Sequence, residues 1–157
     1  MTTQKTRWLS ADEQAAWRAH LEATRRLFDA IDGQLQRDAD MPHAYYEILV
    51  RLSEAPGRSM RMRDLAEVSL SSKSRLSHAV ARLEERGWVQ RLDCPTDKRG
   101  QLATLTDAGF GALAAAAPGH VEQVRTSLIE VLTPQQVEQL RSISEAVLAH
   151  LETETHA

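Results

Sequence analysis

The fold of this chain is decided by residues 58–105, which read RSMRMRDLAEVSLSSKSRLSHAVARLEERGWVQRLDCPTDKRGQLATL. The stretch opens with Arg61–Val68, where apolar residues recur at helical spacing. A break at Ser69–Ser72 ends that helix. A second helix is predicted over Ser72–Arg86, because Gly87 readily takes the left-handed conformation that terminates a helix.

Two segments of strand character come next, Trp88–Leu92 and Gln101–Leu105. Between them lies Asp93–Gly100, a polar loop rich in turn-forming residues. Helix, turn, helix and a two-stranded ribbon form the winged helix-turn-helix arrangement, a shape that enters DNA grooves.

The second helix of this pair divides into two faces. Leu76, Val80 and Leu83 stand at positions i, i+4 and i+7, so one stripe is committed to a core. The other faces carry hydrogen-bond donors of the types that contact base edges and phosphates, namely Lys73, Ser74, Arg75, Ser77, His78 and Arg82. A solvated amphipathic helix is the alternative explanation of such a face.

The charge distribution favours a nucleic-acid contact over that alternative. Residues 58–99 hold ten Lys and Arg against six Asp and Glu, a balance of +4, whereas the whole chain carries −3. The remainder of the chain is therefore at −7. A basic segment within an acidic protein indicates a local contact with a polyanion.

A long helix is predicted to precede this region. Ser10-Ala11-Asp12-Glu13 is a capping box, so the helix begins at Ser10 and runs to about Asp38, a length of roughly 40 Å. Its apolar residues recur with a period near 3.5, at Trp17, Leu21, Phe28, Ile31 and Leu35. A helix of that length needs a partner helix to cover its apolar stripe.

A shorter helix is predicted at His43–Ala55, and Arg58–Met60 is a candidate strand that pairs with the ribbon. After the ribbon, Thr106 is expected to cap a helix that either kinks or splits at Pro118-Gly119. Thr133-Pro134-Gln135-Gln136 begins a last helix.

The last helix carries a second stripe with a period near 3.5, at Val137, Leu140, Ile143, Val147 and Leu151, and Glu152–Ala157 are expected to fray. We therefore expect the terminal helices of two subunits to pack into one dimerisation region. A two-fold dimer presents two recognition helices to DNA and requires an inverted-repeat site.

The predicted fold is mainly α with a small β-wing and about six helices. The expected organisation is one intertwined domain: a disordered tail over 1–9, a dimerisation helix over 10–40, the winged helix-turn-helix region over 41–105 and C-terminal dimerisation helices over 106–152.

Composition excludes several classes. The chain has one cysteine, no apolar run approaching the 18 or so residues of a membrane span, and no secretory h-region at its start, so a cytoplasmic protein without a membrane contact is expected. It also lacks a G-x-S-x-G elbow, a phosphate loop, an H-E-x-x-H motif and a dinucleotide glycine fingerprint, so no enzyme and no cofactor is predicted.

The chain resembles the MarR family of bacterial transcriptional regulators over about Ser10–Leu151. The resemblance rests on Leu65-Ala66, Ser71–Ser77, Arg82–Arg91, the wing motif Asp97-Lys98-Arg99 and Leu105-Thr106-Asp107-Ala108-Gly109.

The resemblance implies that the helix over Ser72–Arg86 enters the major groove. It assigns base edges to Lys73, Arg75, Ser77 and His78, and phosphates to Ser72, Ser74 and Arg82. Ser72 as a plain N-cap and His78 as an ordinary surface residue remain open.

In the wing, the resemblance implies that Asp97 orients Arg99 to enter the minor groove, whereas Lys98 is a phosphate contact or a solvated charge. The alternative is an ion pair that only stiffens the hairpin.

The resemblance also implies a repressor that a small anionic or phenolic molecule releases from DNA. Candidate residues for that pocket are Trp17, His20, Arg25, His43, Tyr46 and Arg63.

Two other sensing mechanisms are disfavoured. Cys94, expected to be exposed or half-buried in the wing, has no sequence neighbours that clearly lower its pKa. His43 and Glu47 stand at i and i+4, but two ligands do not make a metal site, so none is predicted. The alternative functions are a dimeric adaptor with a winged-helix shape and a nonspecific architectural DNA-binding protein.

Overall fold

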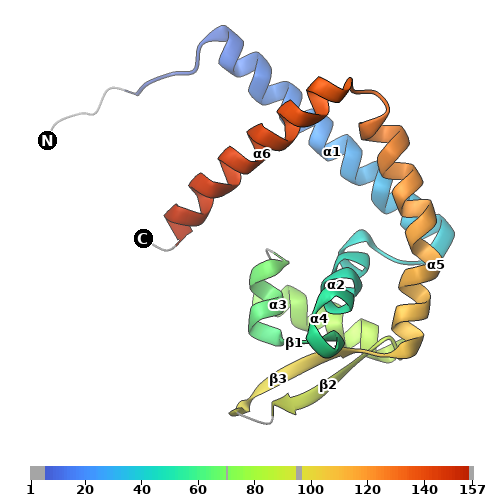
Figure 1. Cartoon of the computed structure of the whole chain (residues 1–157). Helices are drawn as coiled ribbons and strands as arrows, with labels where there is room; N and C mark the ends of the chain where they lie inside the picture. Colours follow the sequence, from blue (N-terminus) through green and yellow to red (C-terminus); the bar gives the residue numbers. More distant parts are fainter. Residues whose placement is uncertain (1–5, 70, 95–96, 156–157) are drawn as a thin grey trace, which may run out of the picture.

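The computed structural model describes the backbone of residues 6–69, 71–94 and 97–155. Six α-helices and one three-stranded sheet are found in this part of the chain, which confirms the predicted fold class. Figure 1 shows the sheet and three short helices gathered at one end, with three longer helices extending from them. We call residues 43–105 the winged unit, and the three longer helices, α1, α5 and α6, the helical arms.

Helix α1 covers Ala11–Ala39 and begins where the sequence predicts. The Ser10 hydroxyl accepts the backbone N–H of Glu13 at 3.2 Å, and the Glu13 carboxylate accepts the backbone N–H of Ser10 at 2.7 Å. The helix ends at Asp40 in the left-handed conformation, with φ of 47°. Of the expected tail, residues 6–9 form no helix or strand, and residues 1–5 lie outside the described part.

The winged unit has its own core. Helices α2 (His43–Glu54), α3 (Met62–Val68) and α4 (Lys73–Glu85) pack on the sheet. The side chains at its centre are almost completely removed from solvent, namely Leu49, Leu52, Leu65, Leu76, Val80, Leu83 and Val89. Each such burial stabilises the fold by about 1.5–3 kcal/mol relative to an exposed side chain.

The turn between α4 and the sheet follows the expected glycine signal. Gly87 has φ of 72°, where a side chain would be strained, and its N–H donates to the carbonyl of Glu84 at 2.8 Å. The N–H of Trp88 then donates to the carbonyl of Leu83 at 2.9 Å, which satisfies a second carbonyl of the last helical turn.

The sheet has the order β1-β3-β2 and is antiparallel throughout. Strand β1 (Ser59–Arg61) pairs with β3 (Asp97–Leu105), which confirms the predicted strand beside the ribbon. Strand β2 (Val89–Cys94) pairs with β3 on its other edge.

The ribbon is longer than predicted. The sequence indicated a loop over Asp93–Gly100, but the strands extend to Cys94 and begin again at Asp97. The pairing of β2 with β3 shifts in register between Asp93 and Cys94, and it continues beyond this irregularity to the pair Cys94–Asp97. The turn-forming residues therefore do not end the ribbon at Asp93. Residues 95–96 lie outside the described part.

Helix α5 covers Asp107–Val124 and passes through Pro118 without splitting. Pro118 removes one backbone donor, but the carbonyl it leaves belongs to Ala114, an exposed residue that water reaches. The irregularity lies further on, in a π-helical turn over Arg125–Ile129.

The start of α5 depends on a glycine. Thr106 caps the helix by accepting the backbone N–H of Gly109 at 3.0 Å, as predicted. A Cβ at Gly109 would collide with the carbonyl of Trp88, so only glycine lets α5 approach the winged unit this closely.

Helix α6 covers Pro134–Thr155 and begins with the predicted capping box, in which Thr133 and Gln136 exchange hydrogen bonds of 2.9 and 3.2 Å. The expected fraying from Glu152 is wrong as far as Thr155, because α6 stays helical to that residue; residues 156–157 lie outside the described part. In Figure 1, α6 begins at the end of the arms far from the winged unit, crosses α1 in this view and runs back toward the level of the winged unit. None of the helices in the described part combines the length and apolar character that a membrane span requires.

Candidate nucleic-acid interface

Helix α4 presents a polar surface on the side opposite its core stripe. Leu76, Val80 and Leu83 are at most 2% exposed, so the orientation of the helix is fixed. Ser77 is half-buried at the edge of the polar surface, and the other predicted contacts are exposed: Ser72, Lys73, Ser74, Arg75, His78 and Arg82. The structure thus brings the predicted residues of this helix onto one accessible surface.

The N-terminus of α4 is capped by Ser72, whose hydroxyl accepts the backbone N–H of Arg75 at 3.3 Å. Ser72 therefore has the capping role that the sequence left open. The positive end of the helix dipole lies at the same place, and it favours a phosphate beside Ser72.

Arg82 is engaged in an exposed ion pair. Its guanidinium donates to the Glu85 carboxylate at 2.7 Å, and this hydrogen bond raises the pKa of Arg82. Exposed ion pairs contribute little to stability, so a phosphate can compete for the guanidinium.

Two other arginines of the basic segment are committed within the protein. Arg91 donates to the Glu84 carboxylate through its backbone N–H at 2.8 Å and through Nε at 2.6 Å, which ties β2 to α4. Arg86 donates to the carbonyl of Asp40 at 2.7 Å, and its guanidinium lies 4.9 Å from the centre of the Trp88 ring. Sequence charge therefore overstates the charge available on this surface.

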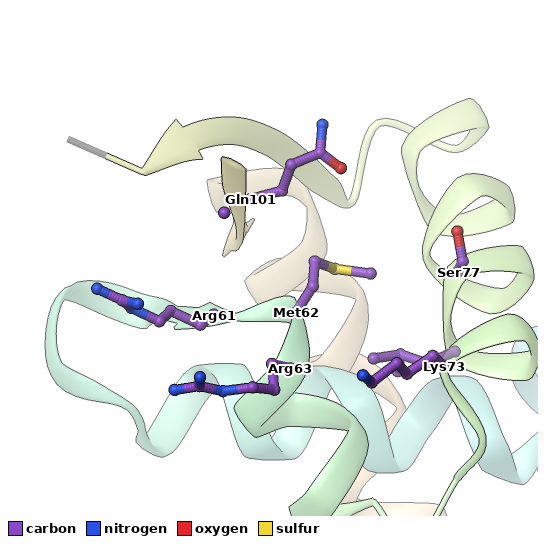
Figure 2. Close-up of a pocket in the computed structure, with 8 residues that line it drawn as sticks. Arg61, Met62, Arg63, Lys73, Ser77 and Gln101 are labelled. Carbon is purple, nitrogen blue, oxygen red and sulfur yellow. The ribbon is translucent and has the colours of Figure 1, made fainter. Parts of the chain in front are cut away.

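A cavity of about 360 Å³ opens beside α4 (Figure 2). It is lined by three basic residues from three elements, Arg61 of β1, Arg63 of α3 and Lys73 of α4. Figure 2 shows the guanidinium groups of Arg61 and Arg63 pointing the same way, with Lys73 extending from α4 toward α3. The Arg63 Nε donates to Asp64 at 3.1 Å.

This cavity lies between α4 and the wing, because Gly100 and Gln101 of β3 line it together with Ser77 of α4. Arg61 was not among the predicted contacts, although it lies in the basic segment and alternates with Arg63. Arg63, a candidate for the small-molecule pocket, lines the cavity beside α4 and not the one that His43 and Tyr46 line.

The predicted wing contacts Asp97, Lys98 and Arg99 are the first three residues of strand β3. Their side chains lie outside the described part, so their roles in the wing remain predictions. Cys94, expected to be exposed or half-buried, is 6% exposed at the end of β2, because the longer ribbon packs it inward.

The residues predicted for a small-molecule pocket do not form one site. His43 and Tyr46 of α2 meet His120 of α5 in a cavity of about 240 Å³, whereas Trp17, His20 and Arg25 lie exposed on the projecting half of α1. The sequence prediction placed them together because it could not show which part of α1 contacts the winged unit.

The three rings of this cavity are in contact. The His120 ring centre lies 4.3 Å from that of Tyr46 and 5.9 Å from that of His43. Burial raises the pKa of Tyr46. Burial also lowers the pKa of His120, the nearby His43 lowers it further, and Glu47 acts in the opposite direction.

His120 could not be found from spacing, because it is far from His43 in the sequence. Although His43, Glu47 and His120 line one cavity, the described residues contain no group of three or more His, Cys, Asp or Glu side chains placed to hold a metal ion.

Comparison with known proteins identifies the family. The sequence model of the MarR family matches residues 39–100. The transcriptional regulator HosA of Escherichia coli O111:H- is 34% identical over 95 residues, which span 60% of this chain and 69% of HosA.

Two solved structures resemble the whole molecule. Sco3205, a MarR family transcriptional regulator from Streptomyces coelicolor solved in complex with DNA, has 53% identity and a TM-score of 0.90, with 93% of this chain and 92% of that chain covered. AbsC, a MarR family transcriptional regulator from the same organism, has 42% identity and a TM-score of 0.89, with 94% and 99% covered. These matches confirm that the protein is a regulator rather than an enzyme, and the chain belongs to the MarR family of transcriptional regulators.

Proposed function

We propose that this protein is a homodimeric, sequence-specific repressor that reads an inverted-repeat DNA site through α4 and the wing. The observation that supports this proposal best is the exposed polar surface of α4. It lies on the side of the helix opposite the buried residues Leu76, Val80 and Leu83. Repression is the commoner mode in the family. A cytoplasmic location follows from the same proposal, since the protein acts on DNA.

The exposed apolar residues of the helical arms support the dimer. Trp17 is 52% exposed, Phe28 48% and Ile143 63%, although all three lie on amphipathic stripes. Further exposed members of these stripes are Leu21, Val121, Leu140, Val147 and Leu151. A second copy of the same arms covers this surface in the proposed assembly.

The DNA contacts are proposed for α4 and the wing. Lys73, Arg75, Ser77 and His78 contact base edges, and Ser72, Ser74 and Arg82 contact phosphates. In the wing, Asp97 orients Arg99 into the minor groove and Lys98 contacts a phosphate. The similarity to Sco3205, solved with DNA, supports these assignments over nearly the whole chain.

The effector response is the third part of the proposal. The cavity of His43, Tyr46 and His120 lies where α2 of the winged unit meets α5 of the arms, so an occupant there can change the angle between them. A phenolic ring that packs on these rings and forms hydrogen bonds with the histidines suits the cavity, whereas Glu47 and Glu54 in its lining disfavour an anion.

Operator selection tests the function. Random duplexes are selected on the wild-type protein, on Arg75→Ala and on Arg18→Ala, an exposed arginine of α1 far from α4. We expect the wild-type protein to select an inverted repeat with half-sites about ten base pairs apart. Arg75→Ala should select an altered sequence and bind the wild-type site more weakly by about 1–3 kcal/mol, whereas Arg18→Ala should behave as wild type.

A salt titration separates the alternatives. Specific and architectural DNA binding both weaken steeply with salt, but only the former selects a motif. A dimeric adaptor would bind DNA negligibly even at low salt, and that result would overturn the proposal.

A further inference from the structure

A separate cavity of about 210 Å³ lies where α1 ends against α5. Gln34 and the exposed Asp38 of α1 line one side, Gly119 of α5 lies opposite, and Trp88 of the winged unit is also part of the lining. The other lining residues are small or apolar: Ala39, Met41, Ala112, Ala115 and Ala116. The cavity is distinct from the one formed by His43, Tyr46 and His120.

Gln34 is the informative residue in this cavity. It is 5% exposed, and its Nε2 donates to the Asp38 carboxylate at 2.9 Å. A carboxylate only accepts hydrogen bonds, so this contact fixes the orientation of the amide. Gln34 Oε1 is left buried, with no hydrogen-bond partner in the described part of the chain.

An unpaired buried carbonyl destabilises the folded protein, so it requires an explanation. An apolar side chain at position 34 would fill the same space between α1 and α5 without this cost. We infer that Gln34 Oε1 is the acceptor for a molecule that occupies the cavity.

The opposite wall lies close to the Gln34 amide. A Cβ at Gly119 would lie 2.8 Å from Gln34 Nε2 and 3.5 Å from the Asp38 carboxylate. Glycine therefore lets α5 approach the amide without displacing it, and the neighbouring alanines give a methyl-lined wall.

The chemistry of the lining defines the occupant. Gln34 Oε1 and the Asp38 carboxylate are acceptors, and among the described residues that line the cavity none is basic. The nearby Arg86 is held by Asp40, at 2.7 Å to the carbonyl and 3.3 Å to the carboxylate. We propose that the cavity binds a small primary amine, its ammonium on Gln34 and Asp38 and its apolar body against the alanines and Trp88.

The size of the cavity agrees with this class, since a cavity of about 150 Å³ holds a benzene-sized molecule. An anion is disfavoured because Asp38 would repel it. The cavity therefore differs in ligand charge from the ring-lined site proposed above.

The position of Trp88 connects the cavity to DNA reading. The N–H of Trp88 donates to Leu83 in the last turn of α4, and its carbonyl accepts the N–H of Thr106 at 3.0 Å, just before α5. An occupant that shifts Trp88 shifts the end of α4 relative to the arms. This regulatory role rests on the proposed function, whereas binding of the amine does not.

The first test measures binding to the full-length protein without DNA. Titration calorimetry and thermal denaturation use butylammonium and 2-phenylethylammonium, each against the carboxylate of the same skeleton, pentanoate and 3-phenylpropionate. We expect saturable binding of at least one amine and of neither carboxylate. Failure of both amines, or equal binding of the carboxylates, overturns the proposal.

Gln34→Leu tests the acceptor, with Gln36→Leu on the exposed side of the same helix as the matched control. We expect Gln34→Leu to weaken amine binding about tenfold or more and to melt no lower than wild type, because an unpaired carbonyl has been removed. Unchanged amine affinity in Gln34→Leu overturns the proposal. So does a structure of the dimer in which a donor of the partner subunit occupies Gln34 Oε1.

Operator affinity measured with and without the bound amine separates the two proposals. Amine binding without any effect on operator affinity would keep the ligand site and remove its regulatory role. A protein that selects an operator but binds no amine would lose this site and remain a regulator.

Discussion

The winged unit and the helical arms treat their apolar side chains in opposite ways. In the winged unit, Leu49, Leu52 and Leu83 are completely buried within one chain. In the arms, Trp17 and Ile143 stay more than half exposed, although they lie on stripes as regular as those of the core. The winged unit therefore buries its apolar side chains within one chain, whereas the arms leave apolar stripes that the proposed second chain would cover.

The largest expected effect comes from breaking the arms. Ile143→Glu together with Val147→Glu places two charges on the stripe of α6, so the dimer should dissociate. Affinity for an inverted repeat should then fall by about 10²–10⁴-fold, because a winged unit bound to one half-site no longer holds a second winged unit near the other. Sedimentation and fluorescence anisotropy measure the two effects.

Ser142→Glu is the matched control, since Ser142 is exposed on the face of α6 opposite the stripe. It should remain dimeric. A double mutant that also remains dimeric would show that α6 does not form the interface.

The next effect comes from the core of the winged unit. Leu83→Ala removes a completely buried side chain of α4 and should lower the free energy of unfolding by about 2–5 kcal/mol. Leu92→Ala, at a residue 47% exposed on β2, should cost about 0.5 kcal/mol or less. Denaturant unfolding compares them, and equal losses would contradict the assigned core.

A smaller effect is expected at the start of α4. Ser72→Ala removes the cap that holds the backbone N–H of Arg75 and should cost about 1 kcal/mol of stability. Ser74→Ala, two residues further on in the first turn of α4, should change the free energy of unfolding by less than about 0.5 kcal/mol. Thermal denaturation distinguishes them, and an equal melting temperature in the two variants would contradict a stabilising cap at Ser72.

The smallest expected effect is a pH dependence of stability at His120, where α5 of the arms meets α2 of the winged unit. Burial and His43 lower the pKa of His120 below its ordinary value of about 6.5, so the unfolded chain takes up the proton first. The contribution of His120 to the free energy of unfolding is fully present above that value, and it is lost as pH falls through it toward the pKa of the folded state. His120→Gln should flatten the melting temperature between about pH 7.5 and 5.5, and an unchanged slope would contradict this assignment.

The elements of the fold were predictable because their signals are local. Capping boxes at Ser10 and Thr133, the cap at Ser72 and the turn at Gly87 depend on a few adjacent residues. Local signals were less decisive at two places. At Pro118 they left a kink or a split open, and α5 does not split. At Cys94 they indicated an exposed or half-buried loop residue, but strand pairing continues past the turn-forming residues and Cys94 is buried.

The candidate sites were predictable only in part. One face of α4 follows from helical periodicity, so its polar residues could be grouped before the structure was known. The meeting of His120 with His43 and Tyr46, and that of Gln34 with Gly119, join distant segments. Such pairs depend on how α1 and α5 cross, which no local pattern specifies.

Hydroxyl-radical footprinting on the selected inverted repeat locates both α4 helices of the proposed dimer at once. We expect two protected patches on one face of the DNA, related by the dyad and about ten base pairs apart, and we expect both to be lost in the α6 double mutant. A single patch, or uniform protection regardless of sequence, would contradict a dimer that reads DNA through two α4 helices.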